Sequence, residues 1–344
     1  MPAMIPHASQ AAAGTAPTVP LRPATRPLVE RVAPHIFRID LPVPEALEPT
    51  NSYLVRGGKH NLLIDAGLNL PQTEEAFDEA LSRLDVPWKT VDVFLTHSDY
   101  DHCAGLTRIA RQGMIVYSGM EDYDDRAVPV LAGEAFAEAA ERVSAAHGVP
   151  YTFDRDYWAP MRDRGEDGIR VSTVEDGDTI KVGDYRFTCI ATPGHDPFCI
   201  CLYEPDAQIL VAGDVLLRDS YSSVLLSSDT DELGQYLANL DRIRDLPCKL
   251  VLTGHGAEFG DLAARVNATK AHYARQLDNV RAVLARGITD PAEVAYATTT
   301  FPRRMPWEER QTFQRNALIG QTMSCLRYLA ERGEYDRPDL IVHK

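Results

Sequence analysis

At 344 residues, 44% of them hydrophobic, the chain is long enough to bury a large core and too apolar to be a fibrous protein. Residues 261–344 contain 13 Lys and Arg against 10 Asp and Glu, which leaves a net charge of −18 on residues 1–260. This acidic balance excludes a nucleic-acid groove on the larger part of the chain, because phosphate binding needs clustered cations.

The first segment, residues 1–28, is rich in Ala and Pro and has neither the basic nor the apolar stretch of a signal peptide. It predicts a disordered tail. No apolar run reaches the roughly 20 residues of a membrane helix, and the six cysteines lack a regular framework spacing. Cys199 and Cys201 are expected to face one side of a buried strand as packed thiols. We therefore expect a cytoplasmic protein with reduced cysteines and no membrane partner.

From about residue 29 the chain alternates short strands with helices, which is typical of an α/β domain. A first helix is predicted where Phe77, Ala80, Leu81 and Leu84 recur at helical spacing, and a second over residues 104–112. The predicted strands cover residues 35–41, 51–57, 60–67, 91–96, 114–119, 178–195, 198–203, 208–214 and 248–256.

Residues 119–170 interrupt this alternation with a helix near 133–147 and a stretch that mixes aromatic and charged side chains. An insert of this kind is typical of a lid or a substrate wall. After residue 260 the chain is predicted to be helical, with one helix from Asp261 to Arg286 ended by Gly287 and another from Trp307 to Arg332. We therefore predict a catalytic domain over residues 29–260 and a helical tail over residues 261–344.

Several predicted strands are followed directly by a side chain that can bind a metal. The sequence H-x-D-x-D-H at residues 97–102 is the densest case, and His195, Asp214 and His255 follow later strands. Asp65 also follows a strand and is predicted to support the others. Imidazole and carboxylate groups together suit zinc, iron, manganese or cobalt.

These segments resemble the metallo-β-lactamase fold superfamily, whose usual motif is T-H-x-H-x-D-H followed by distant His, Asp and His residues. The resemblance spans roughly residues 30–260. It implies a four-layer αββα sandwich, and the tail looks like the winged-helix-type extension of some thioesterase-like or glyoxalase II-like members. Carried over to this chain, the resemblance implies two divalent metal ions, most commonly zinc. Their ligands would be His97 and His195 for the first ion, Asp101, His102 and His255 for the second, and Asp214 between them.

Asp99 departs from the pattern, because most members have histidine there. A carboxylate two residues after His97 points the same way on an extended segment, so we expect Asp99 to reach the first metal. The added negative charge favours iron or manganese relative to zinc and raises the pKa expected for bound water. The alternative is that Asp99 is too short to bind and leaves a single metal.

The resemblance implies a metal-dependent hydrolase in which a hydroxide bridging the ions attacks a carbonyl, with catalytic roles for Asp101 and Asp214. We expect a small-molecule ester, thioester or lactone as substrate. Tyr157 and Trp158 in the insert, and Tyr221 and Ser223 after Asp214, are predicted substrate contacts.

Two other functions stay open. One is a non-heme diiron oxidase or oxygenase of the same fold, since the flavin-dependent diiron members carry a carboxylate at the position of Asp99. The other is a non-catalytic or regulatory binding protein. The tail has a charge of only +3 and no concentrated basic stripe, so we expect packing or a homodimer contact rather than DNA binding.

Overall fold

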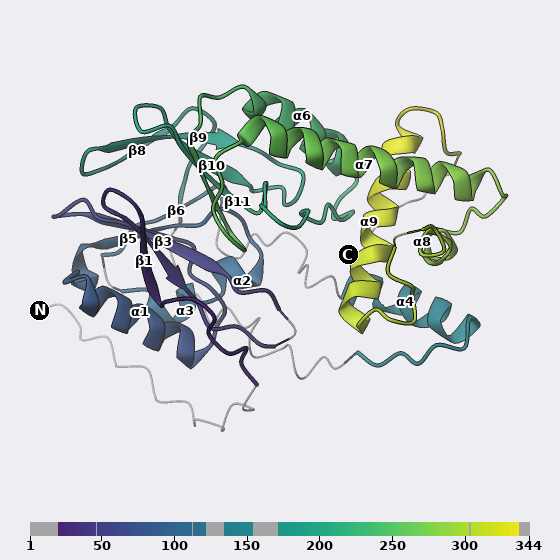
Figure 1. The fold of residues 1–344 in the computed structure, drawn as a ribbon, viewed down its shortest axis with the longest axis horizontal. Helices are drawn as coiled ribbons and strands as arrows, with labels where there is room; N and C mark the ends of the chain where they lie inside the picture. The colour runs from purple at the N-terminus through teal and green to yellow at the C-terminus, as the bar shows by residue number, and fades with distance from the viewer. Residues whose placement is uncertain are drawn as a thin grey trace, which may run out of the picture.

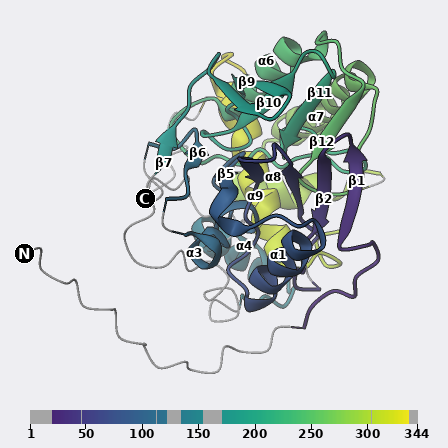
Figure 2. The same ribbon diagram turned by 90° about the vertical axis from the view of Figure 1, so that its left-hand side faces the viewer.

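The computed structural model describes residues 20–45, 47–111, 113–121, 134–153, 171–302 and 304–336. It contains a seven-stranded and a five-stranded β-sheet that face each other, with helices on the outer side of each (Figures 1 and 2). The four-layer αββα sandwich expected from the sequence is therefore confirmed.

The first sheet has the strand order β1-β2-β3-β4-β5-β6-β7. Its first four strands are antiparallel neighbours, and β4, β5, β6 and β7 pair in parallel. Every residue of β3 and β4 is buried, as expected for central strands covered on both faces. The strands are β1 (Val29–Ala33), β2 (Ile36–Asp40), β3 (Asn51–Val55), β4 (Asn61–Ile64), β5 (Val91–Phe94), β6 (Val116–Ser118) and β7 (Val171–Thr173).

The second sheet has the order β12-β11-β10-β9-β8. Strands β9 and β11 both run antiparallel to β10, and β12 is parallel to β11. The carboxyl ends of β9, β11 and β12 therefore lie at the same edge of this sheet. The strands are β8 (Thr179–Val182), β9 (Tyr185–Ala191), β10 (Ile200–Glu204), β11 (Ile209–Gly213) and β12 (Leu250–Thr253).

Three apolar clusters fill the spaces between adjacent layers. Phe94 of the first sheet packs with Phe187 and Leu202 of the second in the central core. The first sheet is covered by α1 (Pro71–Arg83) and α3 (Leu106–Ile109), and the second by α6 (Glu232–Arg244) and α7 (Leu262–Leu284). Cys199 and Cys201 lie in the same outer cluster, which confirms that they share a face. All six cysteines are free.

A helical group stands beside the sandwich (Figure 1). It contains α4 (Glu134–Ala146) from the insert and α8 (Pro291–Thr298) and α9 (Thr312–Ala330) from the tail, which pack around the fully buried Trp307. The residues described after Thr253 contain helices and no strand. The insert helix thus packs with the tail.

Three sequence predictions need correction. In the described part of residues 104–112, the helix is limited to the short α3 (Leu106–Ile109), preceded by α2 (Tyr100–Cys103). The Gly105 amide donates to the Gly67 carbonyl between the two, and the backbone becomes extended at Ala110 with ψ of 132°. Helix α9 begins at Thr312 and not at Trp307, since the Gln314 side chain accepts a hydrogen bond from the Gln311 amide and caps the helix there.

The third correction concerns the amino-terminal tail. Residues 20–28 are part of the fold, whereas residues 1–19 lie outside the described residues. The Arg22 amide donates to the Val43 carbonyl, and Arg26 forms an ion pair with Asp40. Arg26 also donates to Asn51 and to the Gly256 carbonyl, which joins this segment to the turn after β12.

Among the described residues, no helix has both the length and the apolar character needed to cross a lipid bilayer.

Candidate metal centre

The seven predicted metal ligands meet at one end of the two sheets and are called the ligand cluster below. His97 and Asp99 follow β5, Asp101 and His102 lie in α2, and the others follow strands of the second sheet. Three overlapping groups have ligand atoms within 4.8 Å of one another. They are His97, His102 and Asp214; His97, Asp99 and His195; and Asp101, His102 and His255.

The separations suit ligands of shared ions. Two atoms about 2.1 Å from one ion in tetrahedral geometry lie about 3.4 Å apart. Asp99 Oδ2 lies 3.3 Å from His195 Nε2 and 3.7 Å from His97 Nε2. Asp101 Oδ2 lies 3.3 Å from His255 Nε2 and 3.8 Å from His102 Nε2. The cluster therefore has the dimensions of two adjacent metal sites, and Asp99 lies within reach of the first.

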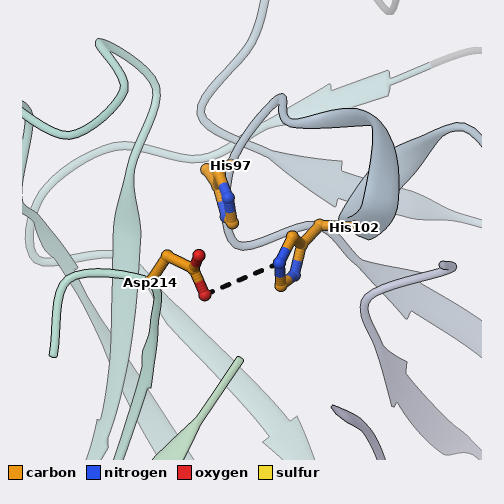
Figure 3. A group of neighbouring side chains, drawn as sticks. All are labelled: His97, His102 and Asp214. Atoms are coloured by element: carbon orange, nitrogen blue, oxygen red, sulfur yellow. Dashed lines mark ion pairs between the residues drawn. The ribbon is translucent and has the colours of Figure 1, made fainter. Parts of the chain in front are cut away.

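Asp214 lies between the two sites. Its Oδ1 is 3.5 Å from His102 Nε2 (Figure 3). Its Oδ2 is 3.3 Å from His255 Nε2 and 4.0 Å from His195 Nε2. Each carboxylate oxygen thus faces at least one histidine nitrogen. This position suits a residue shared by two ions.

All four histidines have Nδ1 bonded to an oxygen, which leaves Nε2 directed at the centre. His195 donates to the Ser223 carbonyl at 2.6 Å and His255 to the Pro49 carbonyl at 3.1 Å. His102 donates to Asp65 Oδ2 at 2.8 Å, and His97 Nδ1 lies 2.9 Å from Thr96 Oγ1. Because a carbonyl or carboxylate can only accept, and the Thr96 hydroxyl donates to Asp65, each Nδ1 carries the proton. In the neutral imidazole each Nε2 then has a free lone pair, as a metal ligand requires.

The centre leaves buried polar atoms without hydrogen bonds. His97 Nε2, His195 Nε2 and Asp214 Oδ1 are buried and have no partner in hydrogen-bonding geometry. His102 Nε2 and His255 Nε2 face each other at 3.3 Å, and neither has a proton to donate when both rings are neutral. Such groups are costly to bury unless a cation lies between them. The residues present therefore fit two metal ions.

Asp65 orients His102 and Thr96 beside the ligand cluster. Its carboxylate accepts hydrogen bonds from the Thr96 amide at 2.8 Å, the Thr96 hydroxyl at 2.9 Å and His102. Its own backbone has φ of +64°, a conformation that a non-glycine residue rarely adopts. The fold thus maintains an unfavourable backbone angle where it places the carboxylate against His102.

The buried carboxylates of the cluster strongly stabilise positive charge placed among them. Burial lowers the pKa of His102, but Asp101, Asp214 and Asp65 outweigh burial and raise that pKa to about 9. Burial likewise opposes ionisation of Asp99, yet His195 and His97 hold its pKa below the usual range. A pair of divalent cations would meet the same demand without protonating the histidines.

Because Gly254 has no side chain, it makes room for Asp214 and His102 of the ligand cluster. A Cβ atom at this position would lie 2.1 Å from Asp214 Oδ1 and 2.7 Å from His102 Cε1. Only glycine therefore lets the turn that carries His255 approach these two side chains so closely.

Two of the four predicted substrate contacts, Tyr221 and Ser223, lie in the described part of the chain. Ser223 accepts the His195 hydrogen bond through its carbonyl, and its hydroxyl accepts from Gln321 of α9 at 2.7 Å. The Tyr221 ring stacks on His272 of α7 and has the Arg265 guanidinium over its face. Both side chains are thus engaged with the tail helices. Tyr157 and Trp158 lie outside the described residues.

Sequence reasoning missed several residues that orient the cluster. Thr96 belongs to the motif and could have been identified from it. The carbonyls of Pro49 and Ser223 give no signal in the sequence, because any residue provides a carbonyl. Thr50, whose hydroxyl donates to Asp101 at 3.4 Å, and Gln321 are likewise brought in from distant segments.

Known proteins share this fold and sequence pattern. The family model described as the metallo-beta-lactamase superfamily matches residues 46–255. The metallo-beta-lactamase family protein TTHA1429 of Thermus thermophilus superposes with a TM-score of 0.68 at 24% identity, covering 88% of this chain and 95% of that one. A beta-lactamase domain protein of Burkholderia ambifaria gives a TM-score of 0.69 at 21% identity, covering 89% and 90%.

Curated relatives include the lactamase-like protein adaB of Aspergillus niger, 29% identical over 76% of this chain and 67% of the relative. The atrochrysone carboxyl ACP thioesterase of Claviceps purpurea is 23% identical over 76% and 68%. The human acyl-coenzyme A thioesterase MBLAC2 is 26% identical over 65% and 79%. With the family model spanning most of the two sheets and the whole ligand cluster, the chain belongs to the metallo-beta-lactamase superfamily.

Proposed function

We propose that the protein is a metal-dependent thioesterase. The observation that carries the proposal is the convergence of four histidine Nε2 atoms and three aspartates with their free oxygens and nitrogens directed at one centre. Two relatives are named thioesterases, one for acyl-coenzyme A and one for a carboxyl acyl-carrier-protein thioester. Their names support hydrolysis of a thioester over the ester or lactone that the sequence also allowed.

Metal ions held by the cluster would supply Lewis acidity for the thioester carbonyl and would lower the pKa of a nearby water. The chain's own groups hold and orient the ligands. Asp65, Thr96 and the carbonyls of Pro49 and Ser223 keep the four imidazoles in one tautomer. Asp101 is held by Thr50 and faces His255, so its carboxylate is fixed at the edge of the second site.

The donor set bears on which metal the site prefers. Asp99, Asp101 and Asp214 give three carboxylates, and the usual family pattern would have two with a further histidine. Oxygen donors shift preference toward harder ions. We therefore propose that iron or manganese competes more strongly with zinc here than in a protein with histidine in place of Asp99.

The test is hydrolysis across matched thioesters, oxygen esters, lactones and β-lactams, by protein with a measured metal content of about two ions per chain. We expect turnover of thioesters, loss of turnover after chelation, and recovery on adding metal. Absence of thioester turnover by the fully loaded protein would refute the proposal. Oxygen consumption with a reductant by iron-loaded protein would instead support the oxidase alternative.

A further inference from the structure

The segment that follows β11 carries two groups that the ligand cluster needs. Asp214 begins this segment, and the Ser223 carbonyl accepts the hydrogen bond of His195 Nδ1 at 2.6 Å. Residues 214–226 are called the ligand loop below. The ligand loop contains no helix or strand of its own. Its conformation therefore depends on contacts with neighbouring elements.

Helix α7 of the tail binds the middle of the ligand loop. Tyr273, which is 1% exposed, donates its hydroxyl hydrogen to the Ser222 carbonyl at 2.5 Å. Arg265 donates to the Ser220 carbonyl, and its guanidinium lies 4.4 Å from the centre of the Tyr221 ring. Because an unpaired carbonyl is costly to bury, the Ser222 carbonyl favours the position in which Tyr273 reaches it.

Helix α9 binds the end of the same loop. Gln321 Nε2 donates to the Ser223 hydroxyl at 2.7 Å, and the Leu226 amide donates to the Gly320 carbonyl at 3.2 Å. Gly320 and Gln321 are neighbours in the middle of α9. One point of this helix therefore holds both a side chain and the main chain of the loop.

The apolar side chains of the ligand loop are buried among tail residues. Val224 and Leu226 belong to the apolar cluster that contains Tyr273, and Leu225 belongs to the cluster around Trp307. All three loop side chains are at most 2% exposed. Removing such side chains from water strongly favours the packed arrangement. The loop thus keeps its conformation only while the tail is packed against it.

The start of the loop is also held by the second layer of the sandwich. Tyr236 of α6 donates to the Val215 carbonyl at 2.7 Å, next to Asp214. The Ser222 hydroxyl donates to the Asp214 carbonyl and so connects the start of the loop to its middle. The tail therefore acts directly on Ser223, and on Asp214 through Ser222.

We propose that Tyr273 and Gln321 are positioning residues of the metal centre, through which the packing of the tail is coupled to metal binding. This inference rests on the metal-binding part of the proposed function and is independent of its thioester chemistry. A metal–ligand bond tolerates roughly 0.2 Å of displacement. Release of the loop from α7 and α9 displaces the Ser223 carbonyl, and with it His195. By linkage, the free energy that tail packing contributes to metal binding equals the free energy that bound metal contributes to tail packing.

The test is the zinc affinity of the full chain, prepared free of metal and titrated in competition with a chelator. A Tyr273→Phe, Gln321→Leu double variant removes both hydrogen bonds with little change in side-chain volume. We expect its affinity for at least one of the two ions to fall at least about tenfold. Equal affinity of the parent and the double variant would overturn the proposal.

Tyr335→Phe is the matched control. Tyr335 is buried in the same apolar cluster as Tyr273, but its hydroxyl donates to the Thr289 carbonyl within the tail, at 2.8 Å. This variant should lose a comparable hydrogen bond of the tail and still bind zinc as the parent does. An equal loss of affinity in Tyr335→Phe and in the double variant would overturn the assignment to Tyr273 and Gln321.

A conservative substitution supplies a rescue. In Gln321→Glu the carboxylate can accept a hydrogen bond from the Ser223 hydroxyl, so the contact is kept with its direction reversed. We expect Gln321→Glu to bind zinc at least as tightly as the parent, and Gln321→Leu to bind it more weakly. Equal weakening in both variants would overturn the role of this hydrogen bond.

Hydrogen exchange measures the coupling in the reverse direction. Zinc should slow amide exchange in α7 around Tyr273 and in α9 around Gln321, and it should slow exchange less in the double variant. Exchange in these helices that zinc leaves unchanged in the parent would overturn the coupling. Thermal unfolding checks that the double variant is folded. If it is not, Tyr273→Phe alone replaces it, and parent affinity for zinc in that variant would overturn the coupling.

Thioester hydrolysis by the same proteins separates this inference from the proposed function. Parent affinity for zinc in the double variant, with thioester turnover by the parent, would sustain the thioesterase and overturn the coupling. Zinc affinity that needs Tyr273 and Gln321, without thioester turnover by the loaded parent, would sustain the coupling and overturn the thioesterase. A parent that binds no zinc would overturn both.

Discussion

Replacing Gly254 with alanine should dismantle the metal sites while leaving the fold largely intact. The new Cβ would lie 2.1 Å from Asp214 Oδ1, whereas real Cβ contacts stay above 3.0 Å. The carboxylate must therefore move by about 0.9 Å, several times the roughly 0.2 Å tolerance of a metal–ligand bond. We expect at least a 10- to 100-fold loss of metal affinity, with an overpacking cost of about 1–3 kcal/mol in unfolding free energy.

Gly256 provides the matched control for this substitution. It lies on the other side of His255, has φ of +72°, and a Cβ there would meet no atom within 4 Å. Gly256→Ala should therefore cost only the strain of a left-handed alanine, about 1–2 kcal/mol. The assay is metal content per chain after equilibration with chelator-buffered zinc, beside thermal unfolding of each variant. The reasoning is refuted if Gly254→Ala retains both ions at the parent's affinity, or if Gly256→Ala loses them equally.

Three further substitutions test the orienting groups, the metal choice and the half-buried His272 of the tail. Asp65→Asn removes the charge that holds His102 Nδ1, and we expect zinc affinity to fall by about 10- to 100-fold in a competition titration; unchanged affinity would mean that His102 needs no carboxylate. Asp99→His should shift the metal content of purified protein from iron or manganese toward zinc, whereas a rise from one ion to two would show that Asp99 leaves the first site weak. His272 has a folded pKa of about 4 against an unfolded value of about 6.5, so the unfolded chain binds more protons between these values and stability must fall as pH decreases through that range. Given the partial exposure of His272, we expect His272→Gln to remove about 1–2 kcal/mol of that fall in urea unfolding at pH 4 and pH 7, and an equal fall in both proteins would contradict this account.

Short-range patterns predicted the alternation of strands and helices and placed several candidate ligands just after strands. The four-layer sandwich and the full ligand set came from the resemblance of these motifs to the metallo-β-lactamase superfamily. Helix α1 was predictable because Phe77, Ala80 and Leu81 form one buried face. Residues 104–112 have a similar spacing, but the close approach of Gly105 to Ala66 is a tertiary contact that the pattern does not contain.

Contacts between distant segments could not be predicted in this way. The tautomers of His195 and His255 depend on main-chain carbonyls, which are the same for every residue type.

The packing of α4 against the tail has a consequence for how the protein folds. Ser144 accepts a hydrogen bond from Trp307 across 163 residues of sequence, and Tyr151 donates to Asn316 across 165. Such non-local contacts close long loops and form slowly, and during synthesis the amino-terminal part emerges first. The apolar face of α4, with Phe136, Ala140 and Val143, is therefore synthesised well before α9, the helix that covers it. Until then this face is exposed, which makes the nascent chain a substrate for chaperones and a protein truncated near residue 260 prone to aggregate.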